Sequence, residues 1–181
     1  MVVNRQHRFR IALKPLEAFL ERAQRALGLS GRELTICLVS DAAIAGMNRT
    51  FRGKRGPTDV LSFPANGAES KQGIRGAGKR GTTEAQRNAG AISTQKRQRA
   101  RRAQRSQDRR AILPSTFYLG DIAISAETAL RNARRLGRTL PDELRVLMLH
   151  GVLHLAGYDH EADRGEMDRL ERRLRQHLGL S

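Results

Sequence analysis

The first part of the chain alternates between apolar and charged positions in a way that predicts two strands separated by a helix. Residues 8–13 alternate weakly and predict a first strand. Pro15 can begin a helix and Gly28 can end one. The apolar residues between them lie at helical spacing and predict an amphipathic helix. A β-branched, apolar run at 33–40 predicts a second strand.

The next stretch predicts a helix, a turn and a strand. Asp41 is a typical N-cap residue, and Ile44 and Met47 would lie on the inner face of the helix that follows it. Residues 50–57 are rich in glycine and charge and predict a turn. Residues 59–64 then predict a third strand that ends at a proline.

Regular patterns return after a long gap and continue to the C-terminus. Residues 117–124 predict a fourth strand, followed by a helix that Ser125 caps. Pro141 and its acidic neighbours predict the start of a long apolar helix. The spacing from Asp163 to Glu166 matches a capping box at the start of a last helix.

These patterns predict an α+β fold, in which a small, mixed sheet of four strands packs with about five helices in a single domain across residues 1–181. Residues 67–113 form an insertion within that domain. The insertion has no aromatic residue and many Gly, Ser, Thr and Gln residues, so it cannot bury enough apolar surface to offset chain entropy. We therefore predict that it is disordered.

The net charge of +16 indicates a polyanionic partner, and nucleic acid is the usual one. The insertion holds 13 Lys and Arg residues against three acids, a net charge of +10, whereas the remaining residues carry only +6. Its basic run is either a solvated loop or an electrostatic arm on an RNA backbone. Without aromatic residues to stack on bases, binding by this arm would not depend on RNA sequence.

No run approaches the 18 apolar residues that a membrane span requires, and the N-terminus lacks the apolar segment of a secretory signal. The single cysteine, Cys37, lies in a predicted strand and cannot form an internal disulfide, which fits a reducing cytosol. We expect a cytoplasmic protein with no membrane partner, in which Cys37 is a small core residue.

The strongest chemical signal is a pair of histidines in the apolar run 146–156. His150 and His154 are four residues apart, so a helix places both imidazoles on one face. Gly157 ends the helix, and the chain then returns to bring in His160. One histidine in an apolar helix is commonly a hydrogen-bonded core residue, but two at this spacing followed by a third favour a metal site. Three imidazoles and an open fourth position are typical of catalytic zinc.

The same spacing occurs in the metzincin proteases, where a glutamate follows the first histidine and acts as the general base. Gly151 occupies that position here. Peptide hydrolysis by that route is therefore disfavoured, and the pattern predicts a metal site that is not proteolytic.

Three separated segments resemble one family, the YbeY proteins. Residues 47–64, which end in Pro-Thr-Asp-Val-Leu-Ser-Phe-Pro, resemble the family's first-loop signature. Residues 119–125 resemble its central strand, and residues 150–160 resemble its metal motif. The resemblance covers nearly the whole chain except residues 67–113, where the family has a short acidic or polar connection.

The resemblance implies an α+β fold and a single-strand-specific, zinc-dependent endoribonuclease. The implied role is rRNA maturation, at the 3′ end of the small-subunit rRNA, together with ribosome quality control. One zinc ion per chain would be held by His150, His154 and His160. The implied partners are rRNA and the small ribosomal subunit, with ribosomal proteins or an assembly GTPase beside them.

Arg52 and His150 are the catalytic candidates, because Arg52 matches a family arginine thought to be catalytic. A guanidinium there could hold a non-bridging phosphate oxygen, although the sequence alone favours an ordinary surface arginine in a glycine-rich loop. Lys54 and Arg55 are candidates for contacts with the RNA backbone. The nucleophile is either water activated at the metal or the substrate's own 2′-hydroxyl.

Asp121 and Asp159 could orient the ligand imidazoles or could be ordinary turn or strand-end residues. Two alternative functions stay open. A zinc hydrolase of another substrate, such as a peptide, needs a carboxylate near the metal, and Glu143 lies two turns before His150 on the same face. In a non-catalytic assembly factor the zinc would only stabilise the fold. Structural zinc usually has four protein ligands, and Cys37 is the only thiol, which favours an open catalytic site.

Overall fold

The computed structural model describes residues 1–65, 118–159 and 163–180. The predicted disordered insertion, residues 67–113, and the candidate ligand His160 lie outside these residues.

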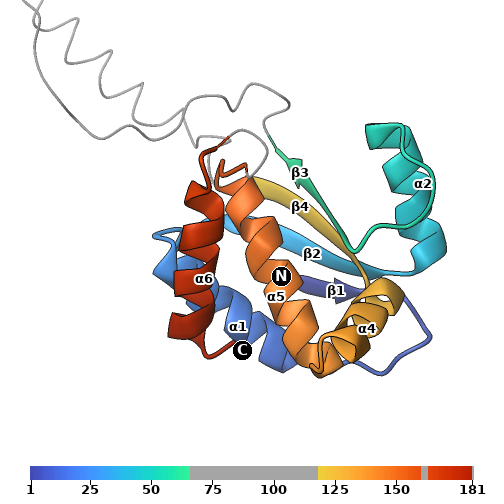
Figure 1. Cartoon of the computed structure of the whole chain (residues 1–181), viewed down its shortest axis with the longest axis horizontal. Coiled ribbons are helices and arrows are strands. Elements are labelled where there is room, and N and C mark those ends of the chain that lie inside the picture. The colour runs from blue at the N-terminus through green and yellow to red at the C-terminus, as the bar shows by residue number, and fades with distance from the viewer. Residues whose placement is uncertain (66–117, 160–162, 181) are drawn as a thin grey trace, which may run out of the picture. The chain divides into compact units, whose positions relative to one another are not determined.

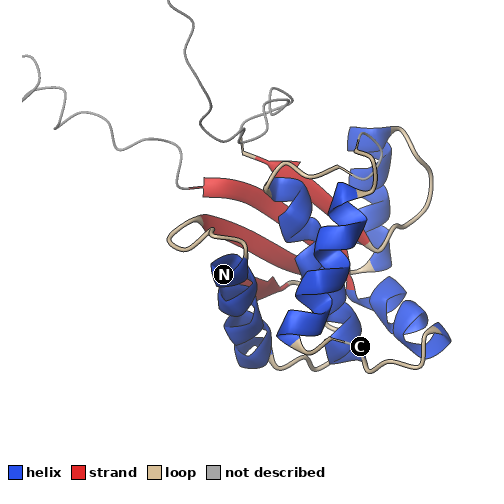
Figure 2. Cartoon of the chain, turned by 60° about the vertical axis from the view of Figure 1, so that its left-hand side comes forward, coloured by secondary structure: helices blue, strands red, loops and turns tan. Residues whose placement is uncertain are grey.

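Within the described residues, a mixed sheet of four strands lies at the centre of the fold (Figure 2). The strands are β1 (Val2–Asn4), β2 (Glu33–Val39), β3 (Val60–Pro64) and β4 (Tyr118–Ser125), in the spatial order β1-β2-β4-β3. Strands β1, β2 and β4 are parallel, whereas β3 pairs antiparallel with β4 and forms one edge. The predicted α+β class and mixed four-stranded sheet are confirmed.

Five helices in the described residues surround this sheet: α1 (Leu13–Ala26), α2 (Asp41–Arg52), α4 (Ala126–Arg135), α5 (Leu140–Leu155) and α6 (Glu166–Leu178). Helix α5 crosses one face of the sheet, with α1 and α6 beside it (Figure 1). No helix in this part of the chain is long and apolar enough to cross a membrane.

The alternation of side chains along β4 divides the core into two parts. Ile122 and Ile124 belong to the larger cluster, which also contains the buried faces of α1, α5 and α6. Ala123 belongs to a smaller cluster with Leu61 and with Ile44 of α2. Because successive strand residues point to opposite faces, α2 covers the face of the sheet opposite α5.

The first strand was predicted in the wrong place. The structure has β1 at Val2–Asn4, paired in parallel with β2, and no strand over residues 8–13. The side chain of Gln6 instead closes a turn: its Oε1 accepts from the backbone N–H groups of Arg8 (2.8 Å) and Phe9 (2.9 Å). These bonds satisfy backbone groups that a strand would have used for pairing.

The N-cap of α2 is Ser40 rather than the predicted Asp41. The Ser40 hydroxyl accepts from the Ala43 N–H at 3.3 Å. The predicted cap of α4 is confirmed, since the hydroxyl of Ser125 accepts from the Thr128 N–H at 3.1 Å. At the start of α6, Asp163 accepts from the Glu166 N–H at 3.0 Å, which is the contact that capping-box spacing predicts.

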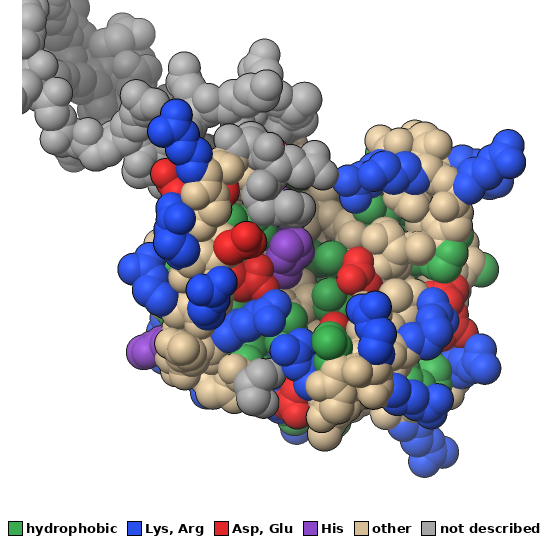
Figure 3. Space-filling model, viewed as in Figure 1, with side chains coloured by type: hydrophobic (Ala, Val, Ile, Leu, Met, Phe, Trp, Pro, Cys, Tyr) green, Lys and Arg blue, Asp and Glu red, His purple; other side chains and the backbone are tan. Residues whose placement is uncertain are grey.

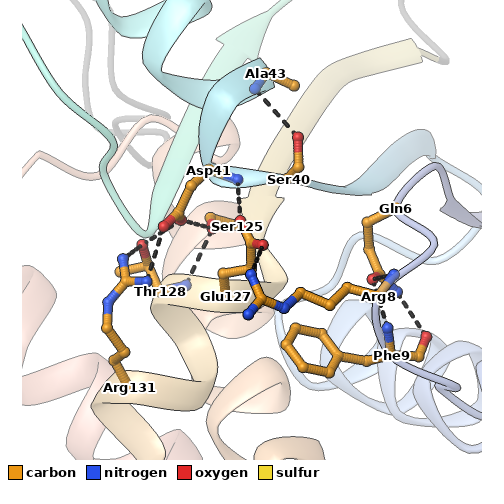
Figure 4. A network of polar contacts seen from close by, with 10 residues as sticks. All are labelled: Gln6, Arg8, Phe9, Ser40, Asp41, Ala43, Ser125, Glu127, Thr128 and Arg131. Carbon is orange, nitrogen blue, oxygen red and sulfur yellow. Dashed lines mark hydrogen bonds and ion pairs between the residues drawn. The ribbon is translucent and has the colours of Figure 1, made fainter.

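Asp41 is used to join the starts of α2 and α4 (Figure 4). Its carboxylate accepts hydrogen bonds from the hydroxyls of Ser125 and Thr128 and pairs with Arg131 at 2.8 Å. Glu127 accepts from the Asp41 N–H at 2.7 Å. Burial alone would raise the pKa of Asp41, but the bonds from Arg131, Ser125 and Thr128 outweigh it and lower the pKa below 3.8. This network anchors the helix whose other end carries Arg52.

Candidate active site

Helix α5 presents two histidine side chains near its C-terminal end. The rings of His150 and His154 lie with centroids 4.8 Å apart and planes at 77°. Most of the helix is buried, because it packs against the sheet and against α1, α4 and α6. The contact between the two rings shows that both imidazoles lie on one face of the helix, as their spacing predicts.

The separation of the two imidazoles fits two ligands of one metal ion. Their Nε2 atoms are 3.2 Å apart. Two nitrogens that each lie about 2.0–2.1 Å from a tetrahedral zinc ion are about 3.3 Å apart. Within the described residues no group of three His, Cys, Asp or Glu side chains is arranged to hold a metal ion. The predicted third ligand, His160, is outside those residues, so the three-histidine set stays a prediction.

Glu171 of α6 supports His150 from the side opposite its Nε2 atom. The Oε2 atom of Glu171 lies 3.0 Å from Nδ1 of His150, and the other carboxylate oxygen accepts from Arg175. Glu171 is only 7% exposed. Burial alone would raise its pKa, but the contacts with His150 and Arg175 reverse that effect and lower the pKa. An ionised Glu171 holds the proton on Nδ1, so the lone pair of Nε2 is available to a metal.

Glu171 is not among the site residues predicted from the sequence, although its position carries a signal. The residue lies on the apolar stripe of α6, four residues after Met167 and three before Leu174, both of which are buried. A carboxylate on a buried stripe needs a partner inside the fold. Arg175, one turn further along, supplies one such partner, and His150 supplies the other.

The histidine pair faces a cleft of about 580 Å³ between α5 and the edge strand β3. Arg52, at the end of α2, lines the same cleft, as do Tyr158 and Asp159 from the turn after α5. Figure 3 shows a histidine side chain in this hollow, with acidic side chains beside it. The fold thus brings Arg52 and the two histidines together across about 100 residues of sequence.

The loop after Arg52 is held in place from beneath. Gly53 ends α2 in the left-handed conformation, at φ 66°, and Asn48 donates from Nδ2 to the Gly56 carbonyl at 3.0 Å. Lys54 and Arg55 lie in this loop with exposed side chains and do not line the cleft. Among the described residues, none forms a salt bridge with Arg52, Lys54 or Arg55.

Strand β3 lines one side of the cleft and is held at the edge of the sheet. Hydrogen bonds to β4 are made at both ends of the strand, where Ser125 donates to Asp59 at 2.9 Å and Ala65 donates to Leu119 at 3.0 Å. In an antiparallel ladder of this register, the N–H and C=O groups of Ser62 point away from β4. The Ser62 hydroxyl donates to the Gly151 carbonyl at 3.3 Å and so ties this edge to α5.

Comparison with known proteins decides the family. Residues 2–179 match the family model described as "Endoribonuclease YbeY". The chain belongs to the YbeY family. It is 35% identical over 180 residues to the endoribonuclease YbeY of Koribacter versatilis, covering 99% of this chain and 86% of that protein. It is 32% identical over 163 residues to the Aquifex aeolicus endoribonuclease YbeY, covering 90% of this chain and 79% of that protein.

A solved structure supports the fold. The chain superposes on a solution structure of a Thermotoga maritima protein with a TM-score of 0.54 and 23% identity, covering 98% of this chain and 89% of that one. Metal dependence is general in the YbeY family. The geometry of His150 and His154 is consistent with that property.

Gly151 is where the histidine motif of this chain departs from the metzincin motif, and the structure gives a physical reason. The residue is buried, and a Cβ atom built on it would lie 2.8 Å from Cγ2 of Ile122 in the sheet beneath. A glutamate at this position would therefore collide with the core instead of reaching the cleft.

The other carboxylates considered from sequence have different positions. Glu143 is 3% exposed and pairs with Arg138 at 3.0 Å, and it does not line the cleft, which removes it as the base of a peptide hydrolase. Asp121 accepts a hydrogen bond from the Tyr118 hydroxyl and does not line the cleft. Asp159 lines the cleft.

Proposed function

We propose that this chain is a zinc-dependent endoribonuclease that cleaves single-stranded RNA. The observation that carries the proposal is the shared cleft, which is lined by Arg52 and by His150 and His154, whose Nε2 atoms lie 3.2 Å apart. Membership of the YbeY family supports RNA as the substrate class. Within that class we propose small-subunit rRNA near its 3′ end, cleaved in the cytoplasm during ribosome maturation and quality control, with ribosomal proteins or an assembly GTPase as partners.

Arg52 has the chemistry to bind the reacting phosphate. Cleavage of a phosphodiester increases the negative charge on its non-bridging oxygens in the transition state. A guanidinium offers two parallel N–H donors to such oxygens and is always charged. Because no described residue forms a salt bridge with Arg52, its donors are available to the substrate. Lys54 and Arg55 follow in the same exposed loop and would contact neighbouring phosphates.

His150, His154 and His160 would hold the zinc ion. When bound, zinc supplies a Lewis acid and lowers the pKa of a water molecule to about 7. His150 is directed into the cleft by Glu171, which holds its Nδ1 proton. The ends of the RNA products distinguish the two candidate nucleophiles. Attack by the substrate's 2′-hydroxyl leaves a 2′,3′-cyclic phosphate, whereas attack by water leaves none.

The proposal predicts that Arg52→Gln and His154→Ala each reduce cleavage of single-stranded RNA by a factor of at least about 100, the usual cost of removing one charged transition-state contact. The measurement is the single-turnover cleavage rate of a labelled oligonucleotide with zinc-loaded full-length chain. Circular dichroism at each assay temperature shows that the variants remain folded.

Matched control variants come from exposed positions outside the cleft. Arg134→Gln on α4 and His177→Ala on α6 remove the same side-chain types and should leave the rate within about twofold of wild type. Cleavage that survives both cleft variants would contradict the proposal and favour a non-catalytic assembly factor.

A further inference from the structure

Phe51 has the most exposed aromatic side chain among the Phe and Tyr residues that the structure describes. It is 66% exposed and lies in the last turn of α2, directly before Arg52. Its ring meets that of Phe63 edge to face, with centroids 5.0 Å apart and planes at 69°. This contact holds the ring on one side and leaves most of its surface uncovered.

The place of Phe51 on its helix explains the exposure. Ile44 and Met47 pack against the sheet, and Phe51 continues the same stripe one turn further along. At that point α2 has reached β3, which is the edge of the sheet. The stripe therefore ends on an aromatic ring that overhangs the edge strand, next to the cleft.

The surroundings of Phe51 are strongly basic. Arg49, Arg52, Lys54 and Arg55 are all exposed, and residues 49–58 contain no acid. Figure 3 shows Lys and Arg side chains over the upper end of α2. Charged residues are depleted in the cores of protein interfaces, whereas aromatic rings among cations are typical of surfaces that bind single-stranded nucleic acid.

We propose that Phe51 is a stacking platform for one unpaired base of the RNA substrate, next to the phosphate that Arg52 holds. This inference rests on the proposed function and adds a binding site for a nucleobase to it. Adjacent residues on a helix point about 100° apart, so a nucleotide can place its base on the ring and its phosphate at the guanidinium. Every base has a π face, so this contact tolerates any sequence.

Stacking on Phe51 has a consequence for substrate choice. The face of a base is available to a protein ring only when the base is unstacked, as in loops, bulges and single strands. A duplex must lose the stacking of that base before it can use this platform. The platform thus favours single-stranded RNA without reading its sequence.

The test combines a protein variant with a modified RNA. The full-length, zinc-loaded chain is assayed at increasing concentration under single-turnover conditions, on a labelled single-stranded oligonucleotide and on a series in which one nucleotide at a time is abasic. Phe51→Leu keeps an apolar contact with Phe63 and removes the aromatic face. It should raise the half-saturating protein concentration about tenfold, which corresponds to ~1.4 kcal/mol.

The abasic series identifies the stacked base. For one position in the series, wild type and Phe51→Leu should have equal half-saturating concentrations, because the RNA has already lost the base that the ring would contact. On intact RNA, the half-saturating concentration of Phe51→Trp should be equal to or lower than that of wild type. Tyr118→Leu is the matched control, since this 37% exposed tyrosine does not line the cleft, and it should leave the half-saturating concentration unchanged.

Two results would overturn the inference. The first is cleavage of intact RNA by wild type and by Phe51→Leu with the same half-saturating concentration. The second is a loss in Phe51→Leu that stays the same on every abasic RNA. A wild type that neither binds nor cleaves single-stranded RNA would instead overturn the proposed function, and the inference with it.

Discussion

Replacing Glu171 with glutamine should weaken zinc binding while the fold is retained. The carboxylate accepts from Nδ1 of His150 at 3.0 Å and from Arg175 through its other oxygen. Glutamine has nearly the same shape, but it is neutral, and one of its two terminal atoms is a donor. The variant therefore loses the charge that holds the Nδ1 proton and directs the lone pair of Nε2 toward the cleft.

The magnitude follows from the position of Glu171 behind a metal ligand. Removing a carboxylate that supports a ligating histidine typically lowers metal affinity by about 10- to 100-fold, or ~1.4–2.7 kcal/mol. A separate loss of stability of about 1–3 kcal/mol is expected, because a buried residue loses a charged hydrogen bond to Arg175. Arg175 has a side chain that is 30% exposed, so water compensates part of that loss.

The assay is competition for zinc between the protein and a chromophoric chelator, with thermal unfolding measured in parallel. Glu143→Gln is a close control, because Glu143 is also buried and also pairs with an arginine, Arg138 at 3.0 Å, but lies outside the cleft. Both variants should lose stability, and only Glu171→Gln should lose zinc affinity. Equal zinc affinities in wild type and Glu171→Gln would refute the role assigned to Glu171.

Two further predictions concern stability. The pKa of Asp41 is lowered below 3.8, so its network stabilises the folded state above that pH, and the contribution is lost as the pH falls through the folded pKa. Asp41→Asn should lower the melting temperature at pH 7 and should make the melting temperature decrease less as the pH is lowered into the acid range. A variant whose melting temperature decreases in acid as much as that of wild type would contradict the role of the network. Gly151→Ala should destabilise the fold by about 1 kcal/mol, because overpacking against Ile122 costs about 1–3 kcal/mol and better helix propensity returns about 1 kcal/mol. Chemical denaturation measures this difference, and a more stable variant would show that Ile122 moves freely.

The helices and strands that could be predicted from the sequence are those in which the pattern of apolar residues is long enough to recognise. Helices α1 and α6 span several turns, so their apolar stripes stand out from chance, and α5 stands out as a long apolar run. Strands β3 and β4 carry consecutive apolar residues beside Pro64 and Ser125, which mark their ends. In contrast, β1 has three residues, too few for any alternation to be visible. Its identity depends on pairing with β2, which is more than 30 residues away in sequence.

The candidate site was predictable where local spacing determines it. His150 and His154 lie on one helix, so a single turn fixes their geometry. Glu171 reaches His150 from another helix, 21 residues away in sequence, and depends on how α5 and α6 pack. The choice of Ser40 over Asp41 as a cap was equally hidden, since both residue types cap helices well and only the long-range partners of Asp41 decide between them.

The most direct test of a zinc-dependent active site is a titration of metal-free chain with zinc, in which cleavage of single-stranded RNA and bound zinc are measured together. We expect no cleavage without metal and a cleavage rate that rises in proportion to bound zinc until one ion per chain is reached. His154→Ala should show no comparable rise at the same zinc concentrations. A cleavage rate that is the same before and after removal of the metal would contradict an active site built on His150 and His154.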